Sequence, residues 1–146
     1  MNSAKQYLKR IWYLEGRIKR DRERLESLRM AADGVKGIVY DADKVQTSPA
    51  DTMSERVGAL VDLQRKLVSE IVELEETKSE VLNVIHSLDN ETMEQMLYLR
   101  YLKRMNFYDI AEEMQYSLSG LHKLHARALA LIEQKRGHTS THSSMV

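Results

Sequence analysis

The chain contains no cysteine, a single proline and six glycines, and each shortage limits what the protein can be. Without cysteine, disulfides and thiolate metal sites are excluded, and a reducing cytoplasm is the expected location. No run of about 18 apolar residues occurs, so we expect no membrane-spanning helix. The N-terminal stretch MNSAKQYLKRIWYLEG has no apolar core of signal-peptide length, and secretion is not expected.

Few large aromatics and few helix breakers, together with many charged residues, predict an all-α protein with a thin core. The net charge is zero, but the charges are unevenly distributed. Residues 1–30 hold nine basic and four acidic residues (+5), residues 31–90 hold six and twelve (−6), and residues 91–146 hold seven and six (+1). A neutral total therefore hides a basic first segment and an acidic second one.

Residues 1–88 are predicted to form a long antiparallel, coiled-coil-like helical hairpin. The first helix spans about 3–31 and the second follows Pro49, with a loop at 32–52 between them. Ser48 is the expected N-cap and Pro49 fits the first helical position. Opposite charges favour pairing within one chain, although the same heptads could also assemble a homodimer. The expected apolar seams are Tyr7, Ile11, Leu14, Ile18, Leu25 and Leu28, interrupted by Asp21, and Met53, Val57, Leu60, Gln64, Leu67, Ile71, Leu74, Lys78, Val81, Ile85 and Leu88.

Residues 89–136 are predicted to form a headpiece of three shorter helices, at about 90–103, 107–114 and 118–135. Asp89 or Asn90, then Asn106, and then Ser117 are the expected caps. The small, polar tail at 137–146 is expected to be disordered.

The stretch 107–131 has the pattern of a helix-turn-helix. A short helix carries Ile110, Ala111 and Met114, and a new helix begins three residues later at Ser117. The second helix is expected to bury Leu121, Leu124, Ala128 and Leu131. Its outer face would then present Ser119, His122, Lys123, Ala126 and Arg127. The predicted DNA-binding residues are Ser117, which caps the helix, and Ser119, His122, Lys123 and Arg127, which face the DNA.

Within residues 88–132 the sequence resembles region 4 of bacterial sigma factors. The matching positions are Leu88, Leu97, Leu99, Arg100 and Tyr101, the Asp109-Ile110-Ala111-Glu112 signature, Ser117, and the closing Ala126-Arg127-Ala128-Leu129. By this resemblance the base-reading positions fall on Leu118, Ser119 and Lys123, of which only Lys123 is a strong donor. The preceding helices have no sigma counterpart. The whole chain is similar to small phage transcriptional regulators of Gram-positive hosts, including ArpU-like and RinA-like late-gene activators.

This resemblance implies a phage-encoded, sequence-specific regulator acting in the host cytoplasm. Its expected partners are double-stranded DNA, a second copy of the chain in a homodimer, and RNA polymerase. Two alternatives stay open: a phage packaging component resembling a small terminase subunit, and a protein-binding adaptor without specific DNA binding.

No catalytic, metal or cofactor site is predicted. There is no nucleophile elbow and no glycine-rich phosphate loop. His122 and His125 are interpreted as surface or phosphate-contacting histidines, since no cysteine or carboxylate nearby completes a metal site. Trp12 and Tyr13 are expected to be packing residues or part of a partner contact.

Overall fold

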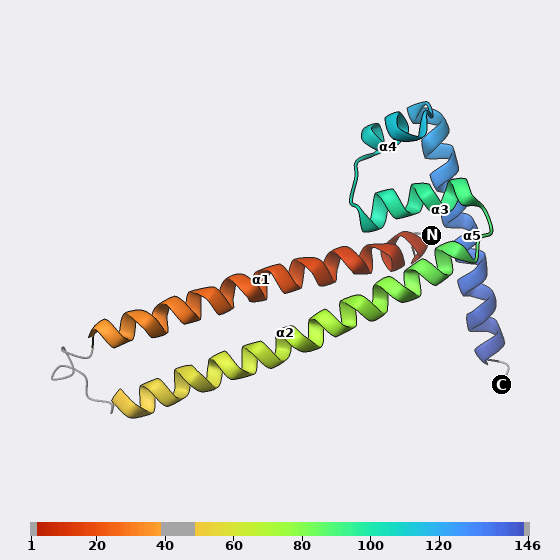
Figure 1. Ribbon diagram of the computed structural model, residues 1–146. Helices are drawn as coiled ribbons and strands as arrows, with labels where there is room; N and C mark the ends of the chain where they lie inside the picture. The colour runs from red at the N-terminus through yellow and green to blue at the C-terminus, as the bar shows by residue number, and fades with distance from the viewer. Residues whose placement is uncertain (1–2, 39–48, 145–146) are drawn as a thin grey trace. The chain divides into compact units, whose positions relative to one another are not determined.

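The computed structural model describes residues 3–38 and 49–144, with side chains described for 3–33 and 52–137. These residues are helical apart from short turns and include no strand, which confirms the all-α prediction (Figure 1). No helix among them is both long enough and apolar enough to cross a membrane. The elements are α1 (Ser3–Ile38), α2 (Pro49–His86), α3 (Glu91–Leu97), the π-helical turn η2 (Tyr98–Leu102), α4 (Phe107–Met114) and α5 (Leu118–Ser144).

The chain divides into two compact units. Leu14–Leu74 form one, called here the helix-pair unit, and Met1–Tyr13 with Glu75–Val146 form the other, called the head unit. This division differs from the predicted boundary at 88/89, because the first turns of α1 and the last turns of α2 belong to the head unit. The sequence gives no sign of this, since the heptad pattern runs unbroken through both boundaries.

Two helix ends differ from the prediction. Helix α1 continues past residue 31 to Ile38, so the first part of the predicted loop 32–52 is helical. Helix α5 likewise continues through Gly137 to Ser144, where a disordered tail was expected. Glycine within a helix costs only about 1 kcal/mol relative to alanine, so it weakens a helix without ending it. Helix α2 begins at Pro49 as predicted, whereas the expected cap Ser48 lies outside the described residues.

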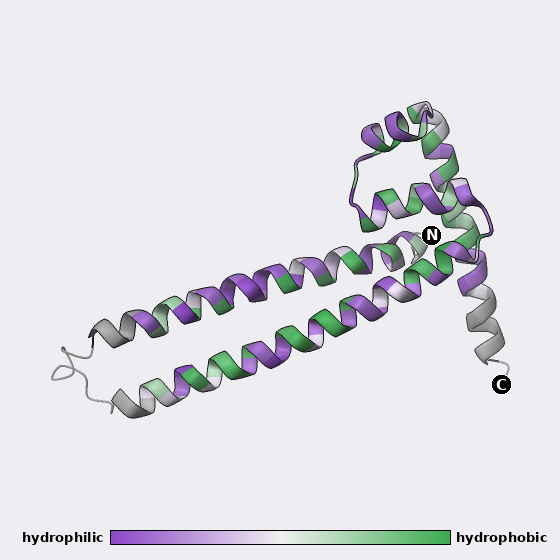
Figure 2. Ribbon diagram, viewed as in Figure 1, coloured by the Kyte–Doolittle hydropathy of each residue, from purple (hydrophilic) through white to green (hydrophobic). Residues whose placement is uncertain are grey.

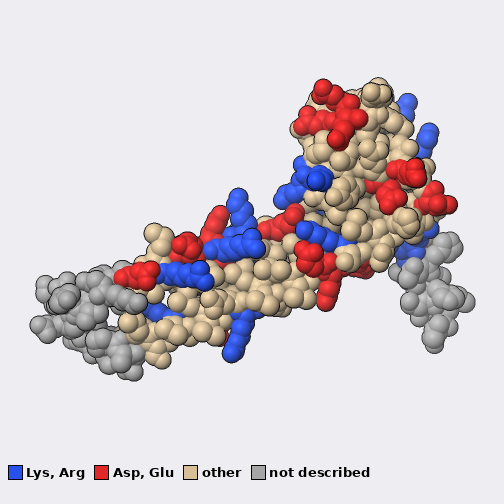
Figure 3. Space-filling view, viewed as in Figure 1, with Lys and Arg blue, Asp and Glu red and all other residues tan. Residues whose placement is uncertain are grey.

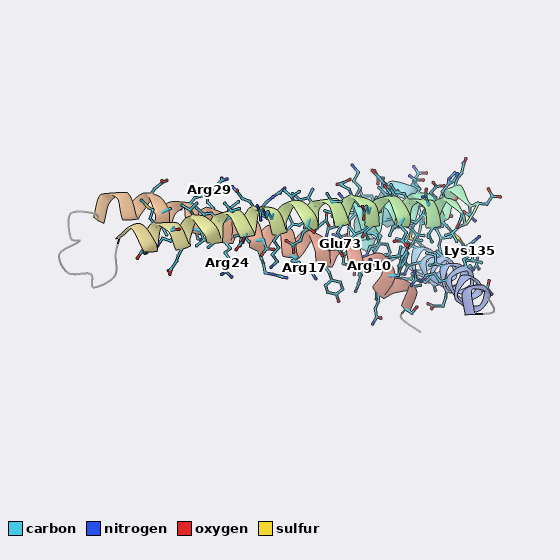
Figure 4. The ribbon with its side chains drawn as sticks, turned by 90° about the horizontal axis from the view of Figure 1, so that it is seen from below. Arg10, Arg17, Arg24, Arg29, Glu73 and Lys135 are labelled. Atoms are coloured by element: carbon cyan, nitrogen blue, oxygen red, sulfur yellow. The ribbon has the colours of Figure 1, made fainter. Side chains whose placement is uncertain are left out.

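In the helix-pair unit, α1 and α2 lie side by side and run antiparallel (Figures 1 and 4). Arg17 Nε lies 3.6 Å from Glu70 Oε2, and Lys66 Nζ lies 3.6 Å from Asp21 Oδ2. Asp21 lies four residues after Arg17 on α1, and its partner Lys66 lies four residues before Glu70 on α2, as antiparallel pairing requires. Arg17 and Arg24, seven residues apart, lie along the same side of α1 (Figure 4).

The predicted seam is correct on α1 and partly wrong on α2. Leu14, Ile18 and Asp21 are buried, with Leu25 and Leu28 partly buried. On α2, Leu67, Leu74 and Val81 are buried as predicted, but Val57 and Gln64 are exposed. Leu63, Glu70 and Thr77 are buried in place of Gln64, Ile71 and Lys78. Leu67 and Leu74, seven residues apart, define the middle of the buried side of α2. Which neighbouring positions are also buried depends on the helix that packs against them. In this structure they are the positions on the side of α2 that faces Arg17 and Asp21. As a consequence, α2 carries hydrophobic residues on its exposed side as well as on its buried side, and Figure 2 shows hydrophobic residues along much of this helix.

Glu70 is the unusual member of this seam, since it is only 4% exposed and lies beside Asp21. Burial, and then the neighbouring Asp21 carboxyl, raise the pKa of Glu70. A raised carboxyl pKa contributes stability that is present in acid and is lost as pH rises through the folded-state pKa. At neutral pH, Glu70 therefore destabilises the helix pair relative to an apolar residue of similar size.

We expect Glu70→Leu to raise the free energy of unfolding at pH 7 by about 1 kcal/mol, because an apolar residue replaces a buried carboxyl while Arg17, whose side chain is 49% exposed, stays in contact with water. The gain should shrink as pH falls toward the range in which Glu70 is protonated. Thermal unfolding followed by circular dichroism between pH 4 and 8 measures both effects. Glu73→Leu, at an exposed site one turn further on, is the matched control and should give little gain. A Glu70→Leu protein that melts at or below the wild-type temperature at pH 7 would contradict the assignment.

The head unit is built around the start of α1. Ala4, Tyr7, Leu8 and Ile11 are buried there. Glu133 of α5 accepts hydrogen bonds from the Ala4 backbone N–H (2.8 Å) and from the Ser3 hydroxyl (2.7 Å). The Glu133 carboxylate thus satisfies an amide at the N-terminus of α1, and these bonds lower its pKa. The other fully buried side chains of this core are Val81, Ile85, Met96, Leu97, Tyr101, Ile110, Leu121, Ala128 and Ile132.

Candidate nucleic-acid interface

The helices α4 and α5 are joined by a short turn whose polar groups are satisfied locally. Asn106 caps α4 by accepting from the Asp109 N–H (2.8 Å), as predicted. Gln115 ends α4 in the left-handed conformation (φ 58°), and the Tyr116 N–H donates to the Ala111 carbonyl (2.9 Å). The chain therefore reverses within three residues, and α5 starts directly after Ser117.

Ser117 caps α5, which confirms that part of its predicted role. Its hydroxyl accepts from the Gly120 N–H at 3.0 Å. A Cβ on residue 120 would lie 3.0 Å from this same hydroxyl oxygen, so Gly120 leaves room for the cap. Asn90 caps α3 in the same way by accepting from the Met93 N–H (3.0 Å).

One face of α5 is exposed and carries the other predicted contact residues. Ser119, His122, Lys123 and Arg127 are all exposed, as is Ala126 between them. Lys123 and Arg127 are one helical turn apart and therefore share a ridge on this face. The structure thus brings together on one surface the side chains that the sequence placed there.

The buried face of α5 differs from the prediction. Leu121 and Ala128 are buried as expected, but the other buried positions are His125 and Ile132. Leu124 is only half-buried, and Leu131 is 37% exposed. Two of the four buried positions are therefore one residue later than predicted, and Tyr101 packs on the side of α5 that carries His125. The sequence offered little signal for this, since a histidine at that spacing suits a solvated face equally well.

His125 is a core residue and not the surface residue that was expected. Its Nε2 lies 2.8 Å from the Tyr101 hydroxyl, and it is 8% exposed. Burial raises the pKa of Tyr101 to about 12, so this hydroxyl keeps its proton and donates it. His125 Nε2 must then accept, which requires a neutral ring. Burial, followed by the charges of Lys5, Arg100 and His122, lowers the pKa of His125 to about 4.

Aromatic rings continue from this pair in two directions. Trp12 stacks on Tyr101 at 5.4 Å and donates its indole N–H to the Tyr101 carbonyl (2.9 Å). Phe107 contacts the edge of His125 at 5.0 Å and meets His122 at 4.8 Å. Trp12 therefore packs within its own chain, which is the first of the two roles expected for it from the sequence.

The charges around α4 and α5 differ in sign. Helix α4 exposes Asp109, Glu112 and Glu113, and Figure 3 shows acidic side chains gathered over this helix. The exposed face of α5 carries Lys123 and Arg127 and no acidic residue between Leu118 and Ile132. A polyanion would therefore be attracted to α5 and repelled from the outer face of α4.

Among the described residues, no group of three histidine and acidic side chains is arranged to hold a metal ion. No protein-family model, curated protein or solved structure matches this chain.

We expect the head unit to lose stability in acid because His125 must stay neutral to accept from Tyr101. A histidine pKa that is lower in the folded state contributes stability that is present above the unfolded pKa and is lost as pH falls through the folded one. The window is pH 6.5 down to about 4, with a loss of up to about 1.4 kcal/mol per pH unit. Urea unfolding followed by Trp12 fluorescence measures it. His125→Gln, which keeps an acceptor for Tyr101, should flatten this dependence, whereas His122→Gln at the exposed site should not. Equal acid sensitivity in wild type and His125→Gln would refute the role.

Proposed function

We propose that this chain is a sequence-specific DNA-binding regulator of transcription, phage-encoded and acting in the cytoplasm of a bacterial host. In this proposal α1 and α2 form a helical hairpin, and α4, the turn and α5 form a helix-turn-helix whose second helix enters the major groove. The observation that carries the proposal is the division of α5 into two faces directly after its Ser117 cap. One face is held in the core by Leu121, His125 and Ala128, and the other presents Lys123 and Arg127.

The contact residues are assigned by their chemistry. Lys123 and Arg127 donate to base edges or phosphates, Ser119 and His122 make weaker contacts, and the free amides at the start of α5 face a phosphate. The resemblance of residues 88–132 to sigma region 4 supports the same assignment. No catalytic role is proposed.

Replacing Lys123 and Arg127 together by alanine should weaken binding to the preferred duplex by tenfold or more, since each good base contact contributes about 1–3 kcal/mol. The preferred duplex is first selected from random double-stranded DNA with the wild-type protein, and affinities are then measured by fluorescence anisotropy near 150 mM salt. Lys19→Ala with Arg22→Ala removes the same charge from exposed positions of α1 and should leave affinity nearly unchanged. No enriched sequence with the wild type, or full affinity in the Lys123/Arg127 variant, would overturn the proposal in favour of a protein-binding adaptor.

The helix pair is proposed to mediate homodimerisation. Four valines on α2, namely Val57, Val61, Val68 and Val72, are 39–62% exposed and form a stripe away from the seam. Their spacings are four, seven and four residues, so the stripe reads the same in both directions. Two copies packed antiparallel about the midpoint of the stripe would place Val57 opposite Val72 of the second copy, and Val61 opposite Val68. This self-matching is what a two-fold interface needs. Contact between the hairpin and RNA polymerase is the other proposed use of this part of the chain.

Val68→Glu should convert the proposed dimer into a monomer without loss of helix, because a charge would then face the apolar stripe of the second copy. Sedimentation equilibrium gives the mass, and circular dichroism gives the helix content. Ser69→Glu, at the exposed neighbouring position outside the stripe, is the matched control and should remain dimeric. A monomeric wild type would contradict dimerisation, and a large ring would instead favour the alternative of a packaging component.

A further inference from the structure

Three cationic side chains gather around the ring of Trp12. Lys9 Nζ lies 5.5 Å from the ring centroid, and the guanidinium carbons of Arg100 and Arg104 each lie 5.1 Å from it. The ring itself is held in place by its hydrogen bond to the Tyr101 carbonyl and its stacking on Tyr101. Lys9, Arg100 and Arg104 around Trp12 are called here the Trp12 cation patch.

The geometry of the patch follows from the local fold. The π-helical turn η2, closed by the Lys103 N–H donating to the Tyr98 carbonyl (3.1 Å), directs Tyr101 into the core. Arg100, next to it, contacts both Trp12 and Phe107 and donates to the Met105 carbonyl (3.0 Å). Arg104 follows in the left-handed conformation (φ 59°), which turns the chain toward α4. The fold thus brings Lys9 close to Arg100 and Arg104, which are about ninety residues away in the sequence.

Like charges held this close repel one another, and the attraction of each to the indole ring offsets only part of that repulsion. In the described part of the chain, neither Lys9 nor Arg100 has a carboxylate within ion-pair distance. The positive charges of Lys9 and Arg100 are therefore not balanced by an ion pair, and an anion bound between them would supply that balance. A phosphate oxygen suits such a site, since guanidinium and ammonium groups are its usual partners.

The patch adjoins the proposed DNA-reading face. The Arg100 guanidinium lies 4.5 Å from the Phe107 ring centroid, and Phe107 meets His122 at 4.8 Å. His122 is one of the exposed residues on the reading face of α5. A continuous series of contacts therefore leads from Trp12 through Arg100 and Phe107 to α5, without crossing the acidic face of α4.

We infer that the Trp12 cation patch binds a backbone phosphate of the same DNA duplex that α5 reads. This inference rests on the proposed function. It makes the first helix a second, sequence-independent contact to the duplex, which positions α5 without reading bases. The acid-rich α4 and the patch would then set the direction in which the duplex crosses the head unit.

The test uses the full chain carrying Lys9→Gln and Arg104→Asn. Asparagine is chosen because it tolerates the left-handed conformation of residue 104. Affinity for the selected duplex is measured by anisotropy from 50 to 200 mM salt. Loss of one phosphate contact should reduce the salt slope by about 0.9, so the wild type should lose roughly three- to fourfold more affinity than the variant over this fourfold range of salt. The preferred sequence should not change, because no base contact is removed. Lys19→Gln with Arg22→Gln, on the same helix outside the patch, should keep the wild-type slope.

Trp12 is the only tryptophan, so its emission reports on the patch directly. Wild-type emission should change on titration with the duplex and should saturate at the same concentration as the anisotropy. Lys9→Gln alone, on an ordinary helical position of α1, repeats the test without altering the turn at Arg104.

The outcomes separate the two proposals. If the wild type binds the duplex but the variants keep its salt slope and Trp12 emission does not respond, the patch is not a phosphate site and the proposed function stands. If the wild type selects no duplex, the proposed function fails and the patch inference fails with it. Polyglutamate that changes Trp12 emission near 150 mM salt, where the duplex does not, would overturn the inference by identifying an acidic protein as the ligand.

Discussion

The head unit depends on the packing of the first turns of α1 against η2 and α5. Leu8 and Ile11 are completely buried there, Trp12 stacks on Tyr101, and Glu133 accepts from the first amides of the helix. Without α1, the indole that fixes η2 would be missing, and Tyr101 and His125 would lie nearer to water. Because Ala4 and Glu133 are 129 positions apart, closing this core requires long-range contacts, which cost more chain entropy than local ones.

Two buried polar pairs show how differently such groups can be accommodated. Tyr101 and His125 are neutral, share one hydrogen bond and are enclosed by aromatic rings. Asp21 and Glu70 are carboxyls held close together in the helix seam, and their cations Lys66 and Arg17 lie 3.6 Å away at its edge. The first pair satisfies its groups within the core, whereas the second costs stability. Polar seam positions of this kind fix the register of two helices, because sliding by one heptad in either direction would place the Glu70 carboxyl against a leucine of α1, Leu14 or Leu28.

The proposed interface shows why a net charge of zero says little about binding to a polyanion. Acidic residues are concentrated on α2 and on the outer face of α4, and basic residues on α1 and the outer face of α5. What the duplex would meet is the local field of Lys123, Arg127 and the Trp12 cation patch. In the proposed complex the first helix would have two roles: its buried side completes the core, and its basic side would extend the interface.

Several features that depend on near neighbours could be predicted from the sequence alone. These are the starts of α3, α4 and α5 with their caps at Asn90, Asn106 and Ser117, the start of α2 at Pro49 and the exposed face of α5. Each follows from backbone hydrogen bonding and periodicity within a few residues. Three other features depend on long-range packing: the flank of α2 that is buried, the replacement of Leu124 and Leu131 by His125 and Ile132 in the core, and the meeting of Lys9 with Arg100 and Arg104 at Trp12. The physical reason is that a helix with apolar residues on more than one face has no intrinsic preference for which of these faces becomes buried. The partner that packs against it, distant in sequence, selects the face that leaves water.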